Sequence, residues 1–252
     1  MLTEITNILM IPFIGTAIGA ALVFPIKNQV SDVFGKCLNS FAAGIMLAAA
    51  LWSLIIPSIE LSEALSKSRV LSPLLGLWCG VSLFLITDIL LITKQNTPQN
   101  ANNPITTLAI TVHNVPEGMA LGILLAAYIS KTGLVPYTEI LALSIGIGAQ
   151  NLPEGSIVSI PMYVSGKTKL RAFAGGIASA LAELLGALIT LLAASVLISF
   201  MPFLMSFAAG AMIYVVISEL CPEMTSGGKT KLCTIMFTVG FSLMMALDVA
   251  LG

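Results

Sequence analysis

Long apolar segments separated by short polar breaks dominate this sequence. A helix of about 20 apolar residues crosses a bilayer, and eight segments reach or approach that length. To within a few residues they are Ile5 to Phe24, Cys37 to Ile59, Val70 to Thr93, Ile105 to Ile129, Ile140 to Val164, Ala172 to Phe200, Phe203 to Leu220 and Leu232 to Leu251. The pattern predicts an all-α integral membrane protein with eight transmembrane helices in a single domain, residues 1–252.

Two stretches allow more than one interpretation. Only Met201 and Pro202 interrupt the apolar run from Ala172 to Leu220, but one helix of that length would greatly exceed the membrane thickness, so we expect a tight turn there. The first segment has no basic residues ahead of it and no persuasive cleavage site behind it. We therefore expect a spanning helix rather than a removable signal peptide.

A short sequence occurs twice: Ser40-Phe-Ala-Ala-Gly44 lies in the second predicted helix, and Ser206-Phe-Ala-Ala-Gly210 lies in the seventh. These two helices run in opposite directions, so the copies indicate inverted-topology halves, which place a transporter's substrate site between them. We expect a 3+2+3 order, with helices 1–3 and 6–8 as repeats around helices 4 and 5. The alternative is that both copies are only small-residue surfaces for helix packing.

Composition supports a location in lipid. Hydrophobic residues make up 57% of the chain and charged residues 9%, with a mean hydropathy of +1.01, too few polar groups to cover a water-facing surface. The net charge is −1 and the basic residues form no run, so we expect no nucleic acid as a partner. The four cysteines form no CxxC pair, and we expect them to be reduced packing residues.

The basic residues predict the orientation, because Lys and Arg near helix ends stay on the cytoplasmic side. If the N-terminus is outside, the inner loops hold most of the 11 basic residues, namely Lys27, Lys36, Lys94, Lys167, Lys169, Arg171, Lys229 and Lys231. The outer loops then hold Lys67, Arg69 and Lys131. We therefore predict that both termini are outside. The compact loops favour a bacterial inner membrane, with an organelle membrane as the alternative.

Two similar hexapeptides lie inside apolar sequence: His113-Asn-Val-Pro-Glu-Gly118 in the fourth predicted helix and Gln150-Asn-Leu-Pro-Glu-Gly155 in the fifth. Residues four apart share a helix face, so the first and fifth residues of each hexapeptide project together. The proline frees a main-chain carbonyl and predicts a bend. The final glycine lets a neighbouring helix approach closely.

Glutamates in the middle of apolar helices need compensation, because a carboxylate buried in hydrocarbon is costly. Glu117, Glu154 and Glu183 lie in this position, and the single imidazole of His113 cannot neutralise all three, whereas a divalent cation can. Imidazole nitrogen with carboxylate oxygen suits zinc, iron(II), manganese or cadmium better than calcium or copper(I). We predict a metal site that includes these four residues and Gln150; a structural hydrogen bond is the alternative for Glu183.

Other acidic residues lie toward helix ends. Asp88 and Asp248 can reach water there, and the inverted repeat makes Glu60, Glu219 and Glu223 candidates for the mouths of a pathway. An ordinary solvated helix end is the alternative for each.

At the hexapeptides the sequence resembles the ZIP (Zrt/Irt-like) family of divalent metal transporters, whose motif has the form HNxPEG, and in particular its bacterial GufA-like branch. The resemblance covers nearly the whole chain and implies a binuclear site in helices 4–6. The implied first-site ligands are His113, Glu117, Gln150 and Glu154, and the implied second-site ligands are Asn114, Asn151 and Glu183, with the two motif glutamates bridging the metals. Many members have a second histidine where this chain has Gln150, and an amide oxygen is a weaker ligand. The His-rich loop of many members is missing, so no regulation through it is expected.

These observations predict a transporter that moves zinc into the cytoplasm, with cadmium, iron and manganese as further substrates. We expect alternating access through rocking of the repeat bundle against the motif helices, no enzymatic activity and no organic cofactor, and a homodimer as the candidate assembly. A metal-selective channel is the nearest alternative. An intramembrane metallohydrolase and a metal-containing scaffold are the other two.

Overall fold

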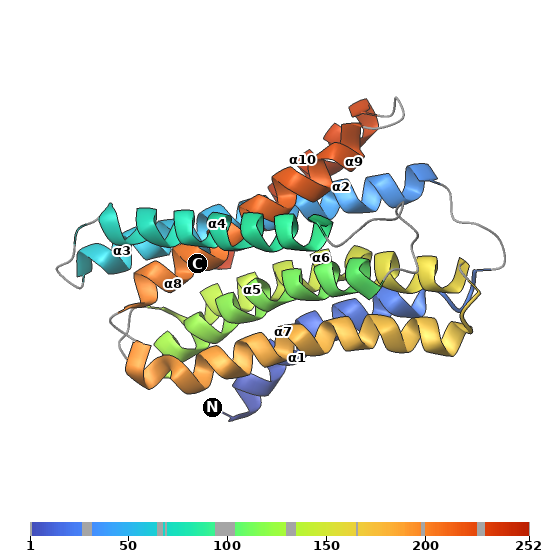
Figure 1. Ribbon diagram of the computed structural model, residues 1–252. Helices are drawn as coiled ribbons and strands as arrows, with labels where there is room; N and C mark the ends of the chain where they lie inside the picture. The colour runs from blue at the N-terminus through green and yellow to red at the C-terminus, as the bar shows by residue number, and fades with distance from the viewer. Residues whose placement is uncertain are drawn as a thin grey trace.

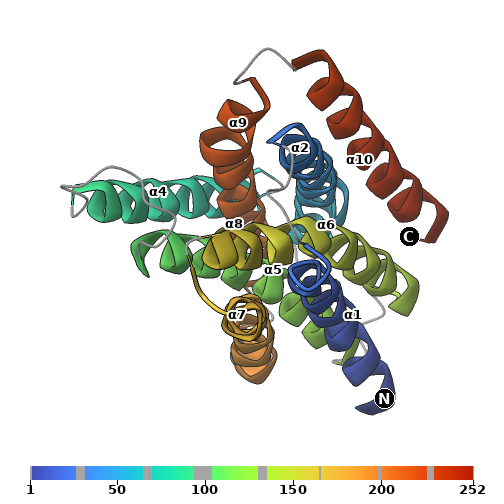
Figure 2. The ribbon, with the colours of Figure 1, turned by 90° about the vertical axis from the view of Figure 1, so that its right-hand side faces the viewer.

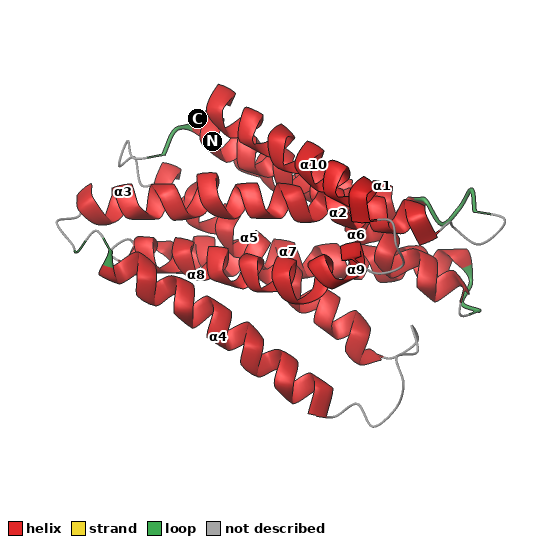
Figure 3. Cartoon of the chain, turned by 90° about the horizontal axis from the view of Figure 1, so that it is seen from above, coloured by secondary structure: helices red, strands yellow, loops and turns green. Residues whose placement is uncertain are grey.

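The computed structural model describes residues 2–26, 32–64, 68, 70–93, 104–129, 135–164, 166–197, 200–225 and 230–251. All regular secondary structure in these parts is helical, as predicted (Figures 1 and 3). In chain order the helices are α1 (Leu2–Ala21), α2 (Asp32–Ala49), η1 (Ala50–Ile55), α3 (Ile56–Ala64), α4 (Leu71–Thr93), α5 (Pro104–Ile129), α6 (Tyr137–Val164), α7 (Lys169–Leu197), α8 (Met201–Val215), η3 (Val216–Leu220), α9 (Cys221–Thr225) and α10 (Thr230–Leu251). The segments η1 and η3 are π-helical and continue directly into their neighbours.

In the part of the chain that the structure describes, six helical segments are long and apolar enough to cross a membrane, so the chain is an integral membrane protein. They are Thr3–Ala21, Val33–Glu63, Leu71–Leu90, Lys169–Ala193, Met201–Leu220 and Thr230–Ala250. Within the described residues α6 is not among them, and α5 contributes only the shorter apolar stretch Glu117–Ile129. The count of eight therefore stays a prediction. Both chain ends lie toward the same end of the bundle (Figures 1 and 3), as an even number of crossings requires.

The expected turn near Met201 is confirmed, and the cysteines agree with the prediction only in part. The turn near Met201 is present, because α7 ends at Leu197 and α8 begins at Met201 with Pro202 in its first turn, where the missing N–H of proline costs no helical hydrogen bond. All four cysteines are free. Cys233 is buried while Cys79 is exposed, so a packing role fits the first and not the second.

The helices form two groups. In the first group, α5 packs along α7 and α1 packs along α6, and α7 also contacts α1 and α6. In the second group, α4 packs along α8 and α2 along α10, with η1 against α8. Figure 2 shows α1 and α7 on one side of the molecule and α2, α9 and α10 on the other. The groups meet through contacts of α2 and α10 with α6, and of α5 with α8.

Glycines set the distance between the paired helices of the second group. A Cβ on Gly240 of α10 would overlap the carbonyl oxygen of Phe41 in α2, and a Cβ on Gly80 of α4 would overlap that of Phe207 in α8. Phe41 and Phe207 are the second residues of the two Ser-Phe-Ala-Ala-Gly copies. The copies therefore take part in helix packing, and they do so through the same residue in both pairs.

The partner helices carry a matching pattern of their own. Gly80-Val-Ser-Leu in α4 is followed by Asp88, and Gly240-Phe-Ser-Leu in α10 is followed by Asp248 at the same spacing. The two π-helical segments also correspond, because η1 and η3 begin at the same distance after the two copies and each is followed by a proline, Pro57 or Pro222. Proline leaves the carbonyl four residues earlier without its helical donor, and that carbonyl lies inside the π-helical segment in both cases.

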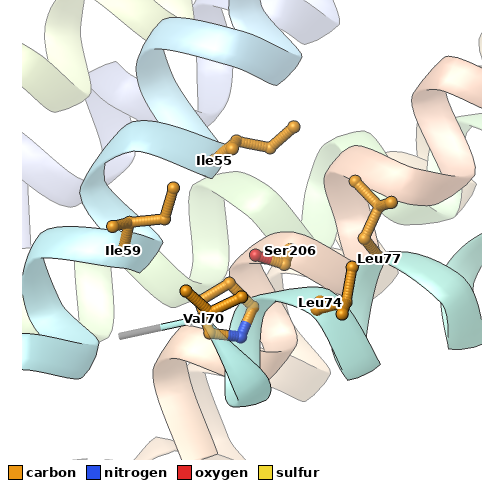
Figure 4. A pocket seen from close by; sticks show the side chains of 7 residues that line it. Ile55, Ile59, Val70, Leu74, Leu77 and Ser206 are labelled. Atoms are coloured by element: carbon orange, nitrogen blue, oxygen red, sulfur yellow. The ribbon is translucent and has the colours of Figure 1, made fainter. Parts of the chain in front are cut away.

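A pocket of about 380 Å³ lies between η1, α3, α4 and α8 in the second group (Figure 4). Its lining consists of Ile55, Ile59, Val70, Pro73, Leu74, Leu77 and Ser206. The hydroxyl of Ser206 is already paired with the Ser58 hydroxyl at 2.7 Å. The pocket thus offers apolar surface, and none of the predicted metal-site residues lines it.

Candidate metal site

The predicted site residues belong to three neighbouring helices of the first group. α5 carries His113, Asn114 and Glu117; α6 carries Gln150, Asn151 and Glu154; and α7 carries Glu183. Four of these side chains are completely buried, Glu183 is 3% exposed, and Glu154 is half-buried. The side chain of His113 lies outside the described part of the structure.

Each of two amides on α6 holds a carboxylate on an adjacent helix. Gln150 Nε2 donates a hydrogen bond of 2.5 Å to Glu117 Oε1 on α5. Asn151 Nδ2 donates one of 2.6 Å to Glu183 Oε2 on α7. Because the two amides are consecutive in sequence and point to different helices, α6 links the carboxylates of α5 and α7.

Among the described side chains of this region, five oxygen atoms have no hydrogen-bond partner. They are Asn114 Oδ1, Glu117 Oε2, Gln150 Oε1, Asn151 Oδ1 and Glu183 Oε1. A buried polar atom normally has a partner, and leaving one unpaired costs about 1–3 kcal/mol. All five are carboxylate or amide oxygens, and an amide oxygen or an ionised carboxylate oxygen only accepts hydrogen bonds. Their chemistry fits a cation, and divalent metals accept such oxygens as ligands.

The charges of the glutamates reinforce this interpretation. Glu117 lies close enough to Glu154 and Glu183 for electrostatic interaction with both, and like charges in a low dielectric repel strongly. Among the described residues, however, no group of three or more His, Cys, Asp and Glu side chains is placed to hold a metal ion. The described donor set therefore depends on the amide oxygens as well as the carboxylates.

Glycines of the motifs bring the helix backbones together. A Cβ on Gly118 would overlap the carbonyl oxygen of Glu183 in α7, and a Cβ on Gly155 would overlap that of Thr16 in α1. The prediction that these two glycines permit close approach is confirmed. Gly186 contributes from the opposite side, since a Cβ there would meet the carbonyl oxygen of Val115.

Two groups that the sequence did not single out contact the motif asparagines. Asn114 Nδ2 lies 3.2 Å from Ser179 Oγ and 3.4 Å from the carbonyl oxygen of Ser179 in α7. Asn151 Nδ2 lies 3.4 Å from the carbonyl oxygen of Pro12 in α1. The spacing of Ser179 four residues before Glu183 was an available signal, because it places both side chains on one face of α7.

The acidic residues near helix ends occupy different environments. Asp248 is 8% exposed and accepts a hydrogen bond from Ser53, so a freely solvated helix end does not describe it. Asp88 is half-buried and accepts one from Tyr214, whereas Glu60 is exposed. Glu219 is half-buried, and the side chain of Glu223 lies outside the described residues.

Glu139, in the first turn of α6, was not predicted. One of its carboxylate oxygens is buried without a hydrogen-bond partner, and the group interacts electrostatically with Asp248 and Glu60. The structure thus gathers three carboxylates near this end of the bundle from α3, α6 and α10.

The chain is similar to known zinc transporters. A family model described as ZIP Zinc transporter matches residues 93–248, which include both hexapeptides and Glu183. The chain is 35% identical to zinc transporter ZIPB of Bordetella bronchiseptica over 95% of this chain and 79% of that protein. It is 29% identical to human zinc transporter ZIP11 over 94% of both chains, and 39% identical to zinc transporter GufA of Myxococcus xanthus over 58% of this chain and 54% of that protein. The chain therefore belongs to the ZIP family of zinc transporters.

Proposed function

We propose that the protein carries zinc into the cytoplasm through a site for two metal ions in α5, α6 and α7, with cadmium, iron and manganese as competing substrates. The observation that carries the proposal is the set of five unpaired oxygens on these helices. A buried oxygen without a partner costs free energy, and a bound cation can satisfy it. Relatives described as zinc transporters support zinc as the first substrate.

The ligands divide between two positions in this proposal. His113, Glu117, Gln150 and Glu154 hold the first metal, and Asn114, Asn151 and Glu183 hold the second together with the two bridging glutamates. The pairing of Gln150 with Glu117 and of Asn151 with Glu183 supports this division, because each pair is joined by one hydrogen bond and retains one unpaired amide oxygen and one unpaired carboxylate oxygen. Oxygen-rich ligation with a single imidazole gives moderate affinity, which allows release.

We propose alternating access between the two helix groups as the transport mechanism. All candidate ligands lie in the first group, and its helices α1 and α7 pack along the motif helices α6 and α5. These contacts favour movement of α1, α5, α6 and α7 as one unit rather than movement of α5 and α6 alone. No P-loop sequence is present in the chain, so the driving force is a gradient of the metal or of a coupled ion.

The proposed topology has eight crossings in 3+2+3 order, with both termini outside a bacterial inner membrane. The corresponding glycine contacts of Phe41 and Phe207 support an inverted repeat, and the shared position of the chain ends supports an even number of crossings (Figure 1). Many of the basic residues that set the orientation lie outside the described residues, namely Lys27, Lys67, Arg69, Lys94, Lys131 and Lys229. A homodimer stays a prediction that light scattering of the purified protein tests.

The alternative functions, a metallohydrolase, a channel and a metal-containing scaffold, lead to different expectations. Members of this family are transporters and not enzymes, which removes the metallohydrolase. A channel with the same site would show fluxes that do not saturate. A metal-containing scaffold would lose stability and show no change of flux when Glu154 is replaced by Gln.

The decisive experiment is uptake of radiolabelled zinc into proteoliposomes. The wild type is compared with Glu117→Gln, which removes a ligand charge, and with Glu63→Gln, which removes an exposed carboxylate of α3. We expect saturable uptake that Glu117→Gln abolishes and Glu63→Gln leaves intact, with cadmium, iron and manganese as competitors. A folded wild type without uptake at any metal gradient would refute the proposal.

A further inference from the structure

We propose that Ser179 of α7 and the main-chain carbonyl of Pro12 in α1 are positioning groups that fix the amides of Asn114 and Asn151 with their oxygens toward the transported metal. The inference rests on the proposed function, since it assigns a role in the same site to two helices that carry neither hexapeptide. It concerns groups that do not themselves bind the metal.

The amide of Asn114 is held through its nitrogen. Both hydrogen bonds of Nδ2 go to Ser179, one to Oγ and one to the carbonyl oxygen. The side chain is fully buried, and Oδ1 has no partner. A carboxamide has two N–H donors on one side and a carbonyl oxygen on the other. Turning it over would set Oδ1 against the carbonyl oxygen of Ser179, which only accepts, so this contact selects the orientation that presents oxygen to the site. In that orientation the hydroxyl of Ser179 accepts the second N–H.

The amide of Asn151 is held in the same manner from the opposite side. Its Nδ2 donates to Glu183 Oε2 and to the carbonyl oxygen of Pro12, and its Oδ1 is buried and unpaired. Both N–H donors of the Asn151 amide thus form hydrogen bonds, as in Asn114, and the amide oxygen again has no partner. Because equivalent asparagines of the two hexapeptides show this arrangement, one anchored from α7 and one partly from α1, the orientation follows from packing of the first helix group as a whole.

The position of α1 is itself fixed by its proline. Pro12 has no N–H, so the carbonyl of Ile8 lacks its helical donor, and Ser144 of α6 donates a hydrogen bond of 2.6 Å to that carbonyl. A Cβ on Gly15 would overlap the carbonyl oxygen of Gly148 in α6, which shows how closely the two backbones lie. The Pro12 carbonyl is thereby held against Asn151.

On α7, Ser179 and Glu183 lie four residues apart and therefore share a face. One side chain orients the Asn114 amide of α5, and the other accepts from the Asn151 amide of α6. This face thus sets the geometry of both amide oxygens at the second metal position. Removal of partners that orient a ligand costs roughly 10–100-fold in metal affinity in other metal sites.

The test uses Ser179→Ala, which removes the hydroxyl, and Ser179→Thr, which keeps it. Ser159→Ala is the matched control, because Ser159 of α6 is also fully buried but its hydroxyl has no hydrogen-bond partner. Equilibrium binding of radiolabelled zinc to the purified protein gives stoichiometry and affinity, and proteoliposome uptake gives KM and the maximal rate.

We expect the wild type to bind two zinc ions. Ser179→Ala should keep the first and bind the second at least roughly tenfold more weakly. The zinc-induced rise in Tm, taken from each variant's own metal-free Tm, should be smaller for Ser179→Ala than for Ser159→Ala. Ser179→Thr should restore binding.

Equal zinc binding by Ser179→Ala and Ser159→Ala would overturn the inference, whereas a folded wild type that neither binds nor transports zinc would overturn the proposed function instead. If Ser179→Ala fails to fold, Ser179→Val replaces it, since valine matches threonine in shape and lacks the hydroxyl, and zinc binding equal to that of Ser179→Thr would overturn the inference.

Discussion

The hydroxyl of Ser53 donates a hydrogen bond of 2.7 Å to Asp248 Oδ1, across 195 positions of sequence. Ser53 lies in the π-helical segment η1, and Asp248 lies near the end of α10. The other helix pair of this group has a related contact, because the hydroxyl of Tyr214, which directly precedes Val215 and η3, donates to Asp88 Oδ2 at 2.9 Å. Each pair thus joins a carboxylate to the helix that contains its π-helical segment.

Loss of the Ser53 hydroxyl should destabilise the protein. Ser53→Ala leaves Asp248 with both carboxylate oxygens unpaired in a buried position, because Oδ2 already has no partner. We expect a loss of about 1–3 kcal/mol, measured as a lower Tm in detergent, and a much smaller loss for Ser159→Ala. Equal Tm values for the two variants would mean that water solvates Asp248.

A methyl group at the α5–α7 contact should separate the helices that hold the site. Gly118→Ala places a Cβ against the carbonyl oxygen of Glu183, whereas Gly35→Ala in α2 meets nothing within 4 Å. Overpacking typically costs about 1–3 kcal/mol, and a small displacement of ligands impairs a site that requires defined geometry. We expect Gly118→Ala to lower Tm and zinc uptake together. Uptake equal to that of Gly35→Ala would show that this contact does not position the ligands.

Replacement of the Gln150 amide by an imidazole should raise the affinity for zinc and lower the rate of zinc uptake. Gln150→His substitutes a nitrogen ligand that zinc binds more strongly than an amide oxygen. It also removes the hydrogen bond that Gln150 donates to Glu117. We expect a lower dissociation constant for zinc and a lower maximal uptake rate, because tighter binding slows release. Weaker zinc binding by this variant would argue that holding Glu117 is the main role of Gln150.

Cysteine labelling in cells tests the orientation. In a background without the four native cysteines, Lys131→Cys should react with a membrane-impermeant maleimide in intact cells. Lys229→Cys should react only after permeabilisation, because the basic loops face the cytoplasm in the proposed topology. The reverse pattern would invert the topology and with it the proposed direction of uptake.

The sequence determined the helices and the chemistry of the site to a large extent. Apolar length indicated the helical segments and the turn near Met201, because a helix is the main way for a chain to satisfy its backbone in lipid. Local spacing placed the motif glutamates and amides on helix faces. The same reasoning identified Gly118 and Gly155 as points of close approach, which the contacts with Glu183 and Thr16 confirm.

Only the tertiary structure decided which helices are neighbours and which atoms are left unpaired. A helix that faces lipid on one side and other helices on the other is apolar all round, so polarity along the sequence does not reveal its contacting face. The anchoring of Asn114 by Ser179, the carbonyl of Pro12 beside Asn151 and the bond from Ser53 to Asp248 all join distant segments. Spacing within one helix determines which side chains share a face, but hydrogen bonds between helices depend on how the helices pack, and here close glycine contacts set that packing.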